Sequence, residues 1–96
     1  MAEKRTKKKI RRVTFSIHAP EAEEVFLVGD FNHWDPVKHP MKKDKSDVWK
    51  KGIMVSPGRY EYKFLVDGQW WNDPNNQDFC FNCFGTLNNV VTICRS

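Results

Sequence analysis

The sequence lacks the features that mark membrane-spanning and disulfide-stabilised proteins. No apolar run approaches the roughly 20 residues of a membrane-spanning helix. Residues 11–18, which follow the basic start, alternate in polarity and do not form the apolar segment of a signal peptide. The three cysteines are an odd number, as expected of reduced thiols and not of a secreted disulfide framework. We therefore expect a cytoplasmic protein that makes no contact with a membrane.

A recognisable catalytic arrangement is also missing. No serine has a plausible His and Asp pairing, and no Gly-rich loop could cradle a phosphate. Four aspartates could in principle supply the paired carboxylates of a glycoside hydrolase: Asp30, Asp35, Asp67 and Asp73. All four lie at expected turns, where an Asp side chain more often bonds the nearby backbone. We therefore expect no catalytic residues and interpret the chain as a non-enzyme.

The cysteines and histidines do not form a recognisable metal site. Cys80 and Cys83 make a single CxxC pair, whereas a structural zinc site usually has a second ligand pair at matched spacing. The three histidines show no such spacing. Two incidental thiols are the favoured interpretation and a redox or metal role is the alternative, so we expect no metal and no cofactor.

Little of the positive charge belongs to the body of the chain. The formal net charge is +4, but residues 1–12 carry seven basic and one acidic side chain, which leaves nine basic and eleven acidic in the remaining 84 residues. Residues 1–10 are charged, have almost nothing apolar to bury, and are expected to be a disordered tail. This distribution disfavours nucleic-acid binding by the fold itself. Binding of nucleic acid or an anionic surface through residues 4–12 is the alternative to a solubilising role.

Helical periodicity is absent, and several short stretches alternate between apolar and polar residues instead. The clearest expected strands are residues 12–18, 25–29, 48–55, 59–66 and 89–94. A short strand is expected near Met41, and residues 79–84 fit either a strand or an extended loop. The Pro57-Gly58 and Asp67-Gly68 pairs predict turns, and the second predicts a tight hairpin that returns through residues 69–71.

These elements predict one all-β domain over residues 11–96. About seven short strands with turns every 8–12 residues are typical of an immunoglobulin-like β-sandwich. A domain of this size buries only about 60–65% of its extended-chain surface, so its 13 aromatic residues must supply much of the core. We expect Tyr60, Tyr62, Phe64 and Val66 to face that core from one strand. The Cys–Trp–Cys spacing of true immunoglobulin domains is absent, so the prediction concerns the architecture alone.

A tryptophan in a polar turn follows the second expected strand, in Gly-Asp-Phe-Asn-His-Trp-Asp-Pro at residues 29–36. Turns normally carry small polar residues, so Trp34 is either packed under the loop or displayed for a partner. Asp30, Asn32 and Asp35 are expected to shape the turn, while His33 has no assigned role.

Other aromatic and polar side chains in the sequence also lie where they could be displayed for a ligand. Trp70 lies near a loop end, Lys63 is on the non-core face of its strand, and Asn88-Asn89 follow Thr86. A tryptophan face is a flat apolar platform on which the C–H face of a pyranose ring can stack, while Lys and Asn donate to its hydroxyls. Trp70 and Trp71 are adjacent, so one should point inward and one outward. Trp49 is expected in the core.

Four motifs in order carry a resemblance to a known family. They are Val-Phe-Leu-Val-Gly-Asp-Phe-Asn-His-Trp-Asp, Gly-Arg-Tyr-Glu-Tyr-Lys-Phe-Leu-Val-Asp-Gly-Gln-Trp, Asp-Pro, and Gly-Thr-Leu-Asn-Asn-Val. Over residues 13–93 the chain resembles the family 48 carbohydrate-binding modules. These include the glycogen-binding domain of AMP-activated protein kinase β subunits and the N-terminal domain of isoamylases and branching enzymes.

The resemblance implies an early-set, immunoglobulin-like sandwich that binds an α-1,4-linked glucan, such as glycogen or starch, without catalysis. The family's two stacking tryptophans correspond to Trp34 and Trp70. Its hydrogen-bonding groups correspond to Lys63, Thr86 and Asn88. An apolar residue that threads against the sugar chain corresponds to Phe84. The family's modules usually belong to a larger enzyme or kinase subunit, and this chain fits either a free-standing protein or a fragment.

Three departures from the family pattern leave alternatives open. Trp71 is aromatic where the kinase-subunit pattern is polar, so either Trp70 or Trp71 could stack on sugar. Phe84 is larger than the aliphatic residue that it replaces. The apolar, Cys-rich residues 79–84 could extend the platform or mediate weak self-association. The alternative function is a protein-interaction module that docks a kinase or glycoside hydrolase partner and has a vestigial sugar site.

Overall fold

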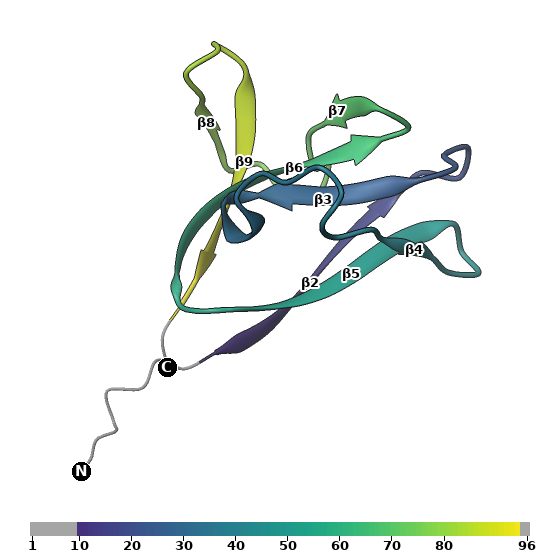
Figure 1. Cartoon of the computed structure of the whole chain (residues 1–96), viewed down its shortest axis with the longest axis horizontal. Coiled ribbons are helices and arrows are strands. Elements are labelled where there is room, and N and C mark those ends of the chain that lie inside the picture. The colour runs from purple at the N-terminus through teal and green to yellow at the C-terminus, as the bar shows by residue number, and fades with distance from the viewer. Residues whose placement is uncertain (1–9, 95–96) are drawn as a thin grey trace.

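The structure is a computed structural model that describes residues 10–94, and within these residues it is built of short β-strands (Figure 1). The tail expected at residues 1–10 lies outside the described residues except for Ile10. In chain order the elements are β2 (Arg11–His18), β3 (Val25–Gly29), the 3-10 helix η1 (Asp30–Asn32), β4 (Lys42–Lys43), β5 (Val48–Val55), β6 (Gly58–Val66), β7 (Gln69–Trp71), β8 (Phe79–Phe81) and β9 (Leu87–Ile93). No helix in this part of the chain is long and apolar enough to cross a membrane.

Two antiparallel sheets make up the fold, which confirms the predicted β-sandwich. The smaller sheet has the strand order β2-β5-β4, and the larger has the order β3-β6-β9-β8 with β7 paired to β6. The strand expected near Met41 is the two-residue β4. Residues 79–84 divide into the strand β8 and a turn. The two sheets pack face to face. Each has one apolar face, and this face must be buried against another element.

The core follows from the alternation of apolar residues along the strands. In β6, Tyr62, Phe64 and Val66 are buried, as predicted, and Tyr60 is half-buried against the same cluster. Trp49 of β5 is 7% exposed, and its indole Nε1 donates a hydrogen bond to the Ala19 carbonyl at 2.9 Å. The polar edge of this ring is therefore satisfied inside the core, as buried Trp requires.

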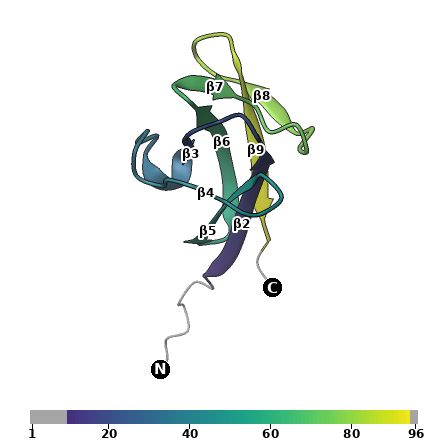
Figure 2. The ribbon, with the colours of Figure 1, turned by 90° about the vertical axis from the view of Figure 1, so that its right-hand side faces the viewer.

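The opposite face of β6 turns away from the smaller sheet and carries Glu61, Lys63 and Leu65. β7 and the hairpin formed by β8 and β9 lie in the upper part of both views, and in Figure 1 they extend in different directions (Figures 1 and 2). The turn after β3 lies beside β6, because η1 contacts that strand. These segments, far apart in the sequence, surround the outer face of β6.

Candidate functional site

A groove of about 920 Å³ lies over the outer face of the larger sheet. Its lining includes all six residues that the sequence resemblance singles out: Trp34, Lys63, Trp70, Phe84, Thr86 and Asn88. Glu61, Phe81, Asn82 and Cys83 complete the lining. The fold thus brings together residues from the turn after β3, from β6 and β7, and from the β8–β9 hairpin.

The turn that carries Trp34 is held in shape by backbone and side-chain hydrogen bonds. Trp34 has a left-handed backbone with a φ of 59°, and its amide donates to the Gly29 carbonyl at 2.9 Å. A Cβ at Gly29 would lie 2.6 Å from the carbonyl oxygen of Glu61, so only glycine allows this close approach to β6. The buried Asn32 accepts from the Gly29 amide and donates to the Leu27 carbonyl. As expected, polar residues shape this turn.

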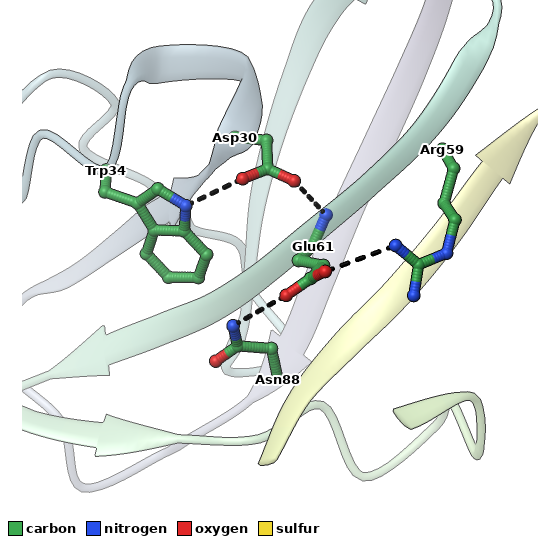
Figure 3. Close-up of polar contacts among 5 residues, drawn as sticks. All are labelled: Asp30, Trp34, Arg59, Glu61 and Asn88. Carbon is green, nitrogen blue, oxygen red and sulfur yellow. Dashed lines mark hydrogen bonds and ion pairs between the residues drawn. The ribbon is translucent and has the colours of Figure 1, made fainter. Parts of the chain in front are cut away.

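Asp30 fixes the ring of Trp34 relative to β6 (Figure 3). Its Oδ1 accepts a hydrogen bond from the Trp34 indole Nε1 at 2.8 Å, and its Oδ2 accepts one from the Glu61 backbone amide at 2.8 Å. The ring is half-buried and lines the groove. Of the two arrangements that the sequence allowed, Trp34 is therefore displayed, with its polar edge tied down and part of its apolar surface open.

Lys63, Thr86 and Asn88 contribute polar groups to the groove, and each makes a hydrogen bond to another lining residue. Lys63 Nζ donates to Thr86 Oγ1 at 3.2 Å, and Asn88 Nδ2 donates to Glu61 Oε1 at 3.0 Å. The hydrogen bond from Asn88 is the main cause that lowers the pKa of Glu61, and Arg59 adds to it through a contact at 3.2 Å (Figure 3). The groove therefore presents an ammonium, a hydroxyl, an amide and an ionised carboxylate side by side.

The two adjacent tryptophans of β7 point to opposite faces of the sheet. Trp70 pairs with Leu65 and lines the groove, whereas Trp71 pairs with Phe64 on the other face and is absent from the lining. The prediction that one of them points inward is right for the direction of Trp71 but wrong for its burial, because 40% of it is exposed. β7 is a three-residue strand that pairs with β6 alone, and the face that carries Trp71 is only partly covered.

Asn82 is a groove residue that the sequence interpretation missed. Its Oδ1 accepts from the amides of Phe84 at 2.9 Å and Thr86 at 3.1 Å. Its Nδ2 donates to Thr86 Oγ1 at 2.7 Å and to Asn88 Oδ1 at 3.1 Å. The sequence does carry a signal for this turn, because Asn at the first position and Gly at the fourth are typical of a β-turn. Asn82 and Gly85 occupy these positions, and the Gly85 amide donates to the Asn82 carbonyl.

Several candidates from the sequence have structural roles outside the groove. Asn89 is fully buried and accepts from the Asp73 amide at 2.6 Å, so it supports the loop after β7. Asp67 accepts from the amides of Glu23 and Glu24, and Asp35 from the amide of Val37. Asp73 accepts from the Tyr62 hydroxyl at 2.7 Å. None of the four aspartates considered for catalysis lines the groove.

The cysteines and acidic groups show no metal-binding cluster within residues 10–94. Cys80, Cys83 and Cys94 are free thiols there, and Cys83 lies in the lining of the groove. Among the lining residues that the structure describes, Glu61 is the only carboxylate. The arrangement is therefore suited to binding a polyhydroxylated ligand by stacking and hydrogen bonding.

Residues 12–96 match the family model described as the glycogen recognition site of AMP-activated protein kinase. The chain is 39% identical over 75 residues to the 5'-AMP-activated protein kinase subunit beta-2 of Homo sapiens, covering 77% of this chain and 26% of that protein. It is 34% identical over 82 residues to the chloroplastic protein FLOURY ENDOSPERM 6 of Oryza sativa subsp. japonica, covering 85% of this chain and 15% of that protein.

A third relative is the chloroplastic protein PTST homolog 2 of Arabidopsis thaliana. The chain is 45% identical to it over 53 residues, which are 55% of this chain and 10% of that protein. The chain thus spans about a quarter or less of the length of these three relatives.

Proposed function

The chain belongs to the family of glycogen-recognition domains of AMP-activated protein kinase, a family of non-catalytic glucan-binding modules, and from this we propose how its groove holds an α-1,4-linked glucan. Trp34 and Trp70 stack on glucose rings, and Phe84 contacts the sugar chain. Hydroxyl groups of the glucan bond to the three polar residues already aligned in the groove: Lys63, Thr86 and Asn88.

The observation that carries this proposal is the convergence of six residues from separate segments on one groove. Trp34 and Asn88 are 54 positions apart in the sequence, and the resemblance singles both out without reference to any fold. The family motif singles out these residues, and the fold places them along one surface. This agreement supports the proposal that they bind the same ligand. The hydrogen bonds of Lys63 with Thr86 and of Asn88 with Glu61 are ones that sugar hydroxyls can join or replace.

The chemistry of the groove fits a neutral polysaccharide. Lys63 and Glu61 bring opposite charges to the lining, so a ligand with a net charge has no clear advantage. A shallow site with few polar anchors suggests a Kd between about 1 µM and 1 mM for a single site. Glycogen presents many chain ends, so its apparent affinity rises if several modules act together.

The groove does not favour hydrolysis of the bound glucan. Glycoside hydrolases use two carboxyl groups on either side of the scissile bond, and Glu61 is the one carboxylate among the lining residues that the structure describes. Its pKa is lowered and not raised, which is the wrong direction for a general acid. Both observations support a binding role.

The names of the relatives and the free thiols suggest a partner and a location for the protein. Several relatives are named as protein kinase subunits, so a kinase is a proposed partner of the protein to which this domain belongs. Others are named as chloroplastic proteins. Three free thiols support a reducing compartment such as the cytoplasm.

Native gels cast with and without glycogen test the proposed site. We expect glycogen to retard the wild-type protein. Trp34→Ala and Trp70→Ala should each lose about 1–3 kcal/mol of glucan affinity, by analogy with aromatic residues that stack on bases, while the fold remains intact by circular dichroism. Trp71→Ala is the matched control, because Trp71 is an exposed neighbour of Trp70 that points to the other face.

Two results would contradict the proposal. Unretarded migration of the wild-type protein in glycogen would show that the protein does not bind this glucan. Retardation of Trp34→Ala equal to that of wild type, or an equal loss in Trp70→Ala and Trp71→Ala, would remove the assigned stacking roles.

A further inference from the structure

Glu61 lines the groove, although the family resemblance assigns it no role. It lies on β6 two positions before Lys63, so the two side chains leave the same, outer face of the strand. The side chain of Glu61 is 25% exposed. Its carboxylate is therefore within the groove and still open to a ligand.

The carboxylate of Glu61 is held by its neighbours. Its Oε1 accepts from Asn88 Nδ2 at 3.0 Å and its Oε2 from Arg59 Nη1 at 3.2 Å (Figure 3). The backbone amide of Glu61 is bonded to Asp30 at 2.8 Å. The bond from Asn88 is the main cause that lowers the pKa of Glu61, and the Cys80 thiol and Arg59 lower it further. The group is thus ionised at neutral pH, and it loses little freedom when a ligand binds.

The other polar groups of the groove offer mainly donors. Thr86 Oγ1 already accepts from Lys63 at 3.2 Å and from Asn82 at 2.7 Å, which uses both of its lone pairs, so this hydroxyl can only donate. The ammonium of Lys63 has no acceptor at all. Asn88 Oδ1 accepts from Asn82 at 3.1 Å, which leaves it one position. A glucose hydroxyl both donates and accepts, so its own hydrogen needs an acceptor that these groups scarcely supply.

Glu61 can supply that acceptor. An ionised carboxylate has about four acceptor positions. Asn88 and Arg59 occupy two, and the nearby Cys80 thiol can occupy a third. At least one position is left for a hydroxyl, and a hydrogen bond to a charged acceptor is stronger than one to a neutral acceptor.

We propose that Glu61 is a further sugar-binding residue, which accepts a hydrogen bond from a glucose hydroxyl and so complements the donors of the groove. This proposal rests on the proposed function. The alternative is that Glu61 acts only through Asn88, by fixing the orientation of that amide.

Isothermal titration with maltoheptaose, a linear α-1,4-linked glucan, tests the role of the carboxylate. Glu61→Gln keeps the size of the side chain but removes its charge, and it should weaken binding by about 5- to 30-fold. Glu61→Asp keeps the charge but withdraws the carboxylate from the groove, so it should also weaken binding. Glu21→Gln is the matched control, because Glu21 is an exposed carboxylate outside the lining. It should bind within about twofold of wild type.

A double-mutant cycle separates direct contact from positioning. If Glu61 bonds the sugar itself, Glu61→Gln should still weaken maltoheptaose binding by at least about fivefold in the Asn88→Ala background. If Glu61 acts only by orienting Asn88, the second substitution should cause no further loss. Circular dichroism of each variant checks that the fold is kept.

The outcomes distinguish this role from the proposed function. If wild type does not bind maltoheptaose, the proposed function fails and the role of Glu61 fails with it. If wild type binds and Glu61→Gln stays within twofold of it, the role of Glu61 alone is overturned. Equal losses in Glu61→Gln and Glu21→Gln, or a loss that disappears in the Asn88→Ala background, also overturn it. So does unfolding of both Glu61 variants, which would show a structural role instead.

Discussion

At the scale of single residues, Asp30 does more than shape a turn. One carboxylate oxygen accepts from the ring of Trp34 and the other from the backbone of β6, so the residue joins the sugar platform to the sheet. The sequence placed Asp30 in the turn but could not indicate its second partner, because Glu61 is 31 positions away. Such a contact depends on which strand lies beside the turn.

Removing this carboxylate should weaken glucan binding without removing the stacking ring. Asp30→Ala frees the Trp34 indole, and the loss should be about 0.5–1.5 kcal/mol, the usual net value of one intramolecular hydrogen bond. That loss corresponds to about a two- to tenfold weaker Kd for maltoheptaose, measured by isothermal titration. Asp35→Ala is the control, because Asp35 lies in the same turn and its carboxylate accepts from the nearby Val37 amide and does not bond the Trp34 ring.

A double-mutant cycle identifies the contact through which Asp30 acts. Trp34→Phe keeps an aromatic ring but has no indole N–H to donate. In the Trp34→Phe background, Asp30→Ala should therefore cause little further loss of affinity. An equal loss from Asp30→Ala in both backgrounds would show that Asp30 does not act through the Trp34 ring.

At the scale of elements, one side chain organises the tip of the β8–β9 hairpin. Asn82 bonds the tip of the hairpin and also the two groove residues Thr86 and Asn88. It thereby acts as a positioning residue for groups that we propose bind hydroxyls. The Asn82 backbone contacts alone would hold the turn but not the orientation of those side chains.

Replacing Asn82 should affect the hairpin locally. In Asn82→Ala the Phe84 and Thr86 amides lose their acceptor, so their hydrogen exchange should accelerate while core amides of β6 stay protected. Glucan affinity should fall by about three- to tenfold, because the groove groups lose their fixed orientation. Asn82→Asp keeps the acceptor oxygen but not the donor. It should restore the slow exchange of the two amides and only part of the affinity.

Loss of protection throughout the domain in Asn82→Ala would point to a role in global stability instead. Full recovery of affinity in Asn82→Asp would show that the bonds from Nδ2 to Thr86 and Asn88 do not matter for binding.

At the scale of the whole molecule, local patterns predicted the elements and the resemblance predicted the site. The alternation in β6 and the Asp67-Gly68 turn follow from near neighbours in the sequence, and both are present. The arrangement of strands into sheets, such as β6 between β3 and β9, depends on pairings over long distances in sequence. The exposure of Trp71 depends on which distant residues cover its face of β7, which no local pattern encodes.

The distribution of charge over the whole chain predicts how binding responds to salt. The basic excess lies within residues 1–12, whereas the groove is lined by one lysine and one glutamate. Stacking on a neutral glucan releases few counterions, so maltoheptaose affinity should change by less than about twofold between roughly 50 and 200 mM salt. A variant without residues 1–9 should bind maltoheptaose as tightly as the full chain.

Binding to an anionic polymer such as heparin is the matched comparison, since it would use the basic residues. It should weaken steeply over the same range of salt and with the removal of residues 1–9. If glucan affinity instead fell in parallel with heparin affinity, the basic segment and not the groove would be the main binding element. The separation of the two responses therefore tests whether the folded domain alone recognises the sugar.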